Sequence, residues 1–301
     1  MPRTGLVRAA WSVVVLNLAV ILWGAWVRIS GSGAGCGSHW PLCDGEVLPR
    51  APSAERLIEF THRATSGLAL LAVVGLAIAV FRALPKGAPA RRAAAAAVAL
   101  ILIEAALGAG LVLFELVAED ASPARALVMP LHLVNTLLLL GALTLVALYA
   151  GGTRRPDPGA ADGLTWAGIL VLQALTGASG AVAALGDTLF PSTSLIAAFA
   201  ADADPASHLL LRLRVAHPAI AVAAALALAL AILRTPEAAP GLGWRRLAGA
   251  LALAQLAIGS ANVALLAPAS LQLAHLLVAD LLWVATVAAC AELFARRAPA
   301  L

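Results

Sequence analysis

The sequence predicts an all-α, polytopic membrane protein of eight transmembrane helices. Of its 301 residues, 62% are hydrophobic and only 12% are charged. Apolar runs of about 20 residues, the length that a helix needs to cross a bilayer, recur along the whole chain. Burial in such a bundle is shared between helices and lipid. The expected spans are residues 8–27, 60–81, 93–115, 127–149, 164–185, 211–233, 247–266 and 271–294.

The distribution of charge predicts the orientation of these spans. Cytoplasmic loops of membrane proteins carry an excess of lysine and arginine. Here the basic residues gather before the first span, after each even-numbered span and at the chain end, whereas most acids lie in the other loops. We therefore expect both termini on the cytoplasmic side of a bacterial plasma membrane. The net charge of +4 calls for no nucleic acid, because basic residues at that surface meet anionic lipid head groups.

The two halves of the chain resemble each other. EAALGAGLVL from Glu104 matches QLAIGSANVAL from Gln255, and RLIEFTHR and LRLRVAHP each bring one histidine to an even-numbered span. Because each half has an even number of spans, the copies keep the same orientation. The sequence thus predicts two tandem four-helix bundles related by a pseudo-two-fold axis along the membrane normal. Their expected ranges are 1–150 and 164–301, joined by a cytoplasmic linker of Gly, Pro and charged residues at 151–163.

Four histidines fall on the even-numbered spans, each near the outer end: His62, His132, His217 and His275. A single histidine within a span is often a hydrogen-bonding or packing residue, and for each one this alternative stays open. Four histidines at similar depth favour haem, because neutral imidazole is a common axial ligand and a helical bundle supplies an apolar slot. Zinc fits less well, since no cysteine accompanies these histidines near the outer side.

Arginines on the outer side support haem binding. They oppose the general inward bias of positive charge and flank the histidine ends of the spans, where haem propionates need cationic partners. Ordinary pairing with outer acids is an equal alternative, for example between Arg63 and Glu59 at i, i+4. The outer arginines are Arg28, Arg56, Arg63, Arg212 and Arg214.

The first outer loop contains two cysteines, Cys36 and Cys43. An oxidising compartment would allow them to form a disulfide that closes a small loop. Cys290, on the cytoplasmic side, is expected to be a small packing residue. His39 and His208, in the outer loops, are expected to face water or lipid head groups.

The run VRISGSGAGCGSHWPLCDGEVLP, followed by IEFTHR and by single histidines in spans 4, 6 and 8, resembles the haem A synthase family over essentially the whole chain. These membrane enzymes convert haem O to haem A. The resemblance implies a resident haem b on His217 and His275. Among the outer arginines, Arg63, Arg212 and Arg214 are the expected cofactor contacts. The resemblance also implies that haem O binds near His62 and His132.

The implied reaction oxidises a haem methyl group to a formyl group, with Glu59 as the nearest acid. Glu59 and His62 lie at i, i+3 and share a helix face, which suits proton delivery beside the iron. The expected partners are haem O, membrane lipid, a haem O synthase and an electron donor, and self-association is left open. The chain departs from some members of the family in having no cysteine pair in its third outer loop.

Three other function classes are weighed against this one. A di-haem b electron carrier would keep the four histidines but would have less need of Glu59. A haem-handling protein would exchange haem without changing it. A prenyltransferase that makes haem O is disfavoured, because the sequence lacks a pair of aspartate-rich motifs for magnesium and diphosphate. Glu104, at mid-span, is expected to be protonated and hydrogen-bonded to a neighbouring helix, or to belong to a proton route.

Overall fold

The computed structural model describes residues 3–50, 53–155 and 163–295. Within these ranges eight helical segments are long and apolar enough to cross a membrane, as predicted, so the chain is an all-helical multi-pass membrane protein. The segments are α1 (Arg3–Ile29), α2 (Ala54–Ala83), α3 (Pro89–Leu113), α4 (Pro123–Gly151), α5 (Gly163–Leu189), α7 (Leu209–Arg214) with α8 (Ala216–Arg234), α9 (Leu242–Ala264) and α10 (Ala269–Leu293).

Side-chain caps and prolines define where several helices begin. The Ser53 hydroxyl accepts a hydrogen bond from the backbone N–H of Arg56 at 3.3 Å, and Ser122 accepts one from Arg125 at the same distance. Pro89 and Pro123 occupy the start of α3 and α4, where a missing N–H costs nothing. These caps fix the N-terminal ends of α2 and α4, which carry His62 and His132.

The sixth span is interrupted, although the sequence predicted one continuous helix over 211–233. The chain leaves α7 at Val215 and resumes as α8 at Ala216. Pro218 has no N–H to donate to the carbonyl four residues earlier, which weakens the helix at this point. A second proline, Pro130, lies inside α4. Each proline is within two residues of a histidine of interest, so both histidines sit beside a local irregularity.

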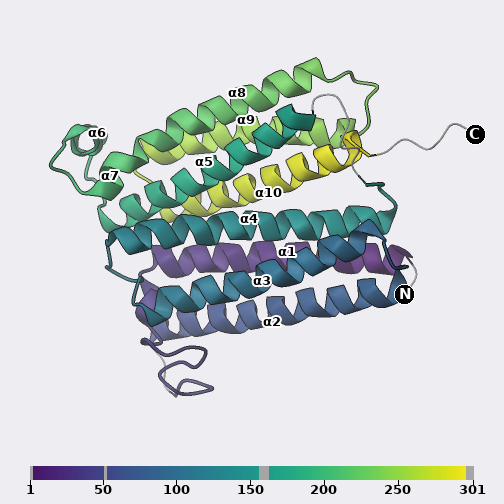
Figure 1. The fold of residues 1–301 in the computed structure, drawn as a ribbon. Helices are drawn as coiled ribbons and strands as arrows, with labels where there is room; N and C mark the ends of the chain where they lie inside the picture. Colours follow the sequence, from purple (N-terminus) through teal and green to yellow (C-terminus); the bar gives the residue numbers. More distant parts are fainter. Residues whose placement is uncertain (1–2, 51–52, 156–162, 296–301) are drawn as a thin grey trace, which may run out of the picture.

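The helices pack as two groups (Figure 1). In the first group α1 contacts α2 and α4, and α3 contacts α2 and α4; in the second, α8 contacts α5 and α9, and α10 contacts α5 and α9. The groups meet where α4 packs on α5 and α10 and where α1 packs on α10. This packing is compatible with the predicted tandem bundles, and the axis relating them stays a prediction.

The two ends of the bundle carry different elements. The start of α1 and the end of α10 lie at one end, whereas the 3₁₀ turn η1 (Ser32–Ala34) with its loop and the short helix α6 (Leu195–Ala203) lie at the other (Figure 1). Most of the predicted linker, residues 156–162, and the tail arginines Arg296 and Arg297 lie outside the described residues.

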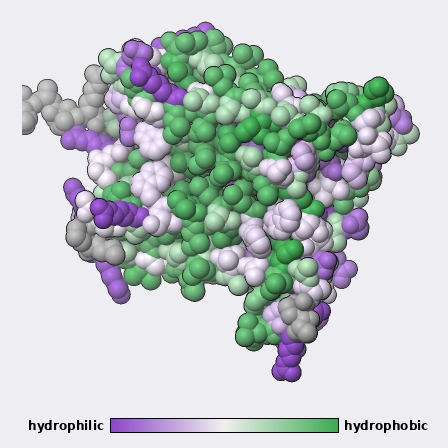
Figure 2. Space-filling view, turned by 180° about the vertical axis from the view of Figure 1, so that it is seen from behind, coloured by the Kyte–Doolittle hydropathy of each residue, from purple (hydrophilic) through white to green (hydrophobic). Residues whose placement is uncertain are grey.

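The surface suits a lipid environment. Figure 2 shows a broad hydrophobic band over the middle of the helices, with hydrophilic residues gathered towards both ends. Large apolar side chains in mid-helix face outwards, among them Leu71 of α2 and Leu253 of α9, which are 67% and 72% exposed. Such exposure would be unfavourable in water, whereas lipid tails accept it.

Candidate functional site

A cavity of about 1550 Å³ runs between the helices and is lined by side chains from both halves of the chain. His62, His132, His217 and His275 all line it, so the structure brings together the four histidines that the sequence singled out. The remaining lining is mostly aliphatic. A space of this kind suits a large, flat, apolar ligand with a few polar groups.

Each of the four histidines faces a glycine on an odd-numbered span. A Cβ atom added to that glycine would lie against the Cε1 atom of the imidazole ring. The pairs and distances are Gly24 with His62 at 2.8 Å, Gly108 with His132 at 3.9 Å, Gly180 with His217 at 3.0 Å, and Gly259 with His275 at 2.9 Å. Real Cβ atoms essentially never approach another atom below 3.0 Å, so the closest of these sites require glycine.

The glycines obey the internal repeat. Gly108 follows Glu104 by four residues in α3, and Gly259 follows Gln255 by four residues in α9. The internal repeat therefore includes these glycines as well as the histidines that they face.

In the second half His217 and His275 face each other across the cavity. Their ring centroids are 6.3 Å apart and the ring planes are almost perpendicular, at 89°. Since a metal–imidazole bond is about 2 Å long, two rings that bind one iron from opposite sides have centres roughly 6 Å apart. The residues present therefore fit a haem iron. Nδ1 of His217 is 3.1 Å from the Ser179 hydroxyl, and the Gln255 amide nitrogen is 3.2 Å from Nε2 of His275.

In the first half His132 lies beside a carboxylate. The Nδ1 atom of His132 is 3.2 Å from Oε1 of Glu104, with the carboxylate off the line of the ring N–H. The other Glu104 oxygen accepts a hydrogen bond from the Asn135 amide at 2.6 Å, and the Thr136 hydroxyl contacts Oε1. The prediction that Glu104 bonds to a neighbouring helix is confirmed. Its alternative role in a proton route stays a prediction.

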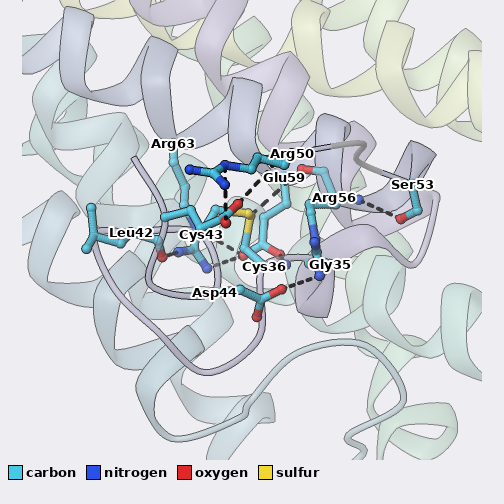
Figure 3. A network of polar contacts seen from close by, with 11 residues as sticks. Gly35, Cys36, Leu42, Cys43, Asp44, Arg50, Ser53, Arg56, Glu59 and Arg63 are labelled. Atoms are coloured by element: carbon cyan, nitrogen blue, oxygen red, sulfur yellow. Dashed lines mark hydrogen bonds and ion pairs between the residues drawn. A yellow bond between two sulfur atoms is a disulfide. The ribbon is translucent and has the colours of Figure 1, made fainter. Parts of the chain in front are cut away.

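Glu59 is buried, with 3% of its surface exposed, and joins helix α2 to the first outer loop (Figure 3). One carboxylate oxygen accepts the backbone N–H of Cys36 at 2.7 Å, and the other pairs with Arg63. Glu59 also lines the cavity, as do His62 and Arg63. The EFTHR stretch therefore forms part of the cavity wall and at the same time anchors the loop.

The loop is closed by a Cys36–Cys43 disulfide, as the sequence predicted (Figure 3). Arg63 donates hydrogen bonds to the carbonyls of His39 and Leu42 at 2.6 and 2.8 Å, so its guanidinium connects α2 to the loop backbone. Arg56 pairs with Asp44 on the opposite side of the loop. These contacts hold the loop against the N-terminal end of α2.

The other predicted arginines have different surroundings. Arg214 pairs with Asp202 at 2.6 Å and with Asp187 at 2.8 Å and lines the cavity. Arg212 is exposed on α7 and is not part of the lining. Arg28 extends from α1 into the second half, where it donates hydrogen bonds to the Ala184 carbonyl at 2.7 Å and to Gln272 at 2.9 Å.

Two cavity residues were not anticipated from the sequence. Arg125, only 4% exposed, donates to the carbonyls of Ala118 and Asp120, and its Nε atom has no partner within the described residues. It precedes His132 by seven residues, and this same-face spacing would have indicated it. Asp280 of α10 is fully buried, and neither carboxyl oxygen has a hydrogen-bond partner in the described part of the chain.

Comparisons with known proteins identify the family of the chain. The COX15-CtaA family model, described as cytochrome oxidase assembly protein, matches residues 8–287. A protein of Thermus thermophilus named Protoheme IX farnesyltransferase is 48% identical over 280 residues, covering 91% of this chain and 46% of that protein. Proteins named Heme A synthase match shorter segments.

Two of these synthases illustrate the extent of the match. The one from Alkalihalophilus pseudofirmus is 39% identical over 133 residues, which is 44% of this chain and 42% of that protein. The one from Symbiobacterium thermophilum is 37% identical over 159 residues, or 50% of this chain and 49% of that protein. The chain thus spans about half the length of the curated relatives that it matches.

Proposed function

The chain belongs to the COX15-CtaA family of cytochrome oxidase assembly proteins, and on that premise we propose that it is a haem A synthase. It would oxidise a methyl group of haem O to a formyl group. The observation that carries this proposal is the set of four histidines, one from each even-numbered span, that line one cavity and face glycines of the odd-numbered spans. Relatives named Heme A synthase support the same conclusion.

The second half would hold a resident haem b. Support comes from the 6.3 Å separation of the His217 and His275 ring centroids, which fits two axial ligands on one iron. A bound haem would supply one-electron redox chemistry. Gly180 and Gly259 would leave room beside the two rings. Arg214 would contact a propionate only with the N–H groups that its bonds to Asp187 and Asp202 leave free.

The first half would bind the substrate, haem O, between His62 and His132. Glu59 lines the cavity three residues from His62, so its carboxyl group is suited to hold or deliver a proton at the reacting edge. Arg63 keeps Glu59 in place and tethers the loop, and it would act as a propionate contact only with the N–H groups that these bonds leave free. Arg125, with its unpartnered Nε, is a further cation for a propionate in this half.

The supply of substrate calls for a farnesyl transfer to haem. A relative that is about twice the length of the matched region is named Protoheme IX farnesyltransferase. The 301 residues contain no pair of aspartate-rich motifs of a prenyltransferase, and we propose that a haem O synthase activity is the partner of this region. An electron donor and the surrounding lipid complete the set of partners. We place the protein in the bacterial plasma membrane, with both termini cytoplasmic and the haem sites towards the outer side.

Expression in cells with and without a source of haem O tests the proposal. The haems are extracted from the membranes and identified by chromatography and mass. We expect haem A only when both the protein and haem O are present. Two bound haems without any haem A would instead identify an electron carrier, and haem exchange without a product would identify a haem-handling protein.

A further inference from the structure

The two halves differ at a position that contacts the histidine of their last span. Aligning His132 with His275 and Gly108 with Gly259 places Glu104 of α3 opposite Gln255 of α9. Oε1 of Glu104 lies 3.2 Å from Nδ1 of His132, and the Gln255 amide nitrogen lies 3.2 Å from Nε2, the other ring nitrogen, of His275. Both halves thus have a polar side chain beside the histidine of their last span, but only the side chain in the first half, Glu104, is a carboxylate.

The surroundings of Glu104 are built to hold that charge. The Asn135 amide donates one N–H to Glu104 and the other to the Leu100 carbonyl, at 2.6 and 3.0 Å, and the Thr136 hydroxyl lies against the second carboxylate oxygen. In the second half the residues at these two positions of α10 are Val278 and Ala279, which cannot donate side-chain hydrogen bonds. Three positions therefore differ together, which points to a function for the difference.

A carboxylate beside the ring of a metal-binding histidine changes the metal. A metal-binding histidine that donates its free ring N–H to a carboxylate is held in one tautomer, and its other nitrogen becomes a more basic ligand. Hydrogen bonding of this kind is one of the means by which a protein sets the electronic properties of a haem iron. In His132 the carboxylate lies 3.2 Å from Nδ1 but off the line of the ring N–H, so its negative charge acts on the ring through proximity. A neutral amide has a much weaker effect, because it carries no net charge.

We infer that Glu104 is a positioning residue that orients and polarises His132, so that the iron site of the first half is more electron-rich than that of the second half. This inference rests on the proposed function in taking His132 and His275 as iron ligands. It assigns the two haem positions unequal reduction potentials, the lower one in the first half. The asymmetry matches a division of labour in which oxidation takes place at one site and electrons are held at the other.

The test is a redox titration of the purified full-length protein loaded with haem b at both sites, followed by visible spectroscopy. Glu104→Gln copies the residue of the second half and should raise the potential of the first site alone. Gln255→Glu should lower the potential of the second site alone. The component that His217→Ala removes identifies the second site in each titration.

Unmoved potentials in both variants would overturn the inference, as would equal shifts of both sites in either variant. Should Glu104→Gln fail to fold, Gln255→Glu still decides the question. The outcome is separate from that of the proposed function. Wild-type protein that makes haem A while the variants keep their potentials would refute only the inference, whereas shifted potentials without haem A would refute only the synthase activity.

Discussion

Replacing Gly259 with alanine tests whether the glycine opposite each histidine makes room for the ligand. The new Cβ would lie 2.9 Å from Cε1 of His275. Carbon atoms prefer a separation of about 3.5–4.0 Å, so the ring must move by roughly 0.6–1 Å. Overpacking of this kind costs about 1–3 kcal/mol. At about 1.4 kcal/mol per tenfold change in affinity, haem should bind the second site roughly 5- to 150-fold more weakly.

The assay is a titration of haem into the purified protein, followed by the low-spin absorption spectrum. Gly249→Ala on the same helix is the matched control, because its Cβ would meet Ile232 at 3.5 Å, an ordinary contact. Alanine also favours the helix over glycine by about 1 kcal/mol, so weaker haem binding would not arise from a weaker helix. Equal haem affinity in the two variants would refute the argument.

Three further predictions concern the ligands, the acid and the loop. His217→Ala or His275→Ala should remove most of the haem b spectrum, because the iron loses an axial ligand; a full low-spin spectrum in both would place the cofactor elsewhere. Glu59→Gln should lower haem A formation by about 10²-fold, the scale of a lost acid or base. Arg63→Ala breaks the same ion pair and should lower haem A formation less. Equal losses in the two variants would show that Glu59 only holds the loop in place. Cys36 and Cys43 should resist thiol reagents in membranes until a reductant is added, and rapid labelling without reductant would contradict the disulfide.

Much of the fold could be predicted because hydropathy reports directly on membrane crossing. The apolar runs located all eight spans within a few residues, and the cysteine pair indicated the disulfide. The break at Val215 was missed, because the hydropathy of a whole span does not register a local interruption, even one that follows Arg212 and Arg214. Pro218 was the available signal. Helix α6 was also missed, because a short helix in a loop leaves no membrane signature.

The site was predictable in its ligands but less so in its neighbours. Four histidines at matching places in a repeat indicated a common site, and the structure brings all of them to one cavity. Which glycines lie opposite the histidines depends on how each helix is rotated about its axis. The sequence of one span does not determine that rotation. Arg125 and Asp280 were missed because one charge within or near an apolar run has several interpretations until its neighbours are known.

The assignment of oxidation to the first half is tested most directly by His62→Ala in cells that supply haem O. The measurement is the amount of haem A and of haem b extracted from the same membranes. We predict that haem A falls to the background of cells lacking the protein, whereas haem b stays at the wild-type level, because His217 and His275 are unchanged. Normal haem A in this variant, or loss of haem b together with haem A, would contradict the division between a substrate half and a resident-haem half.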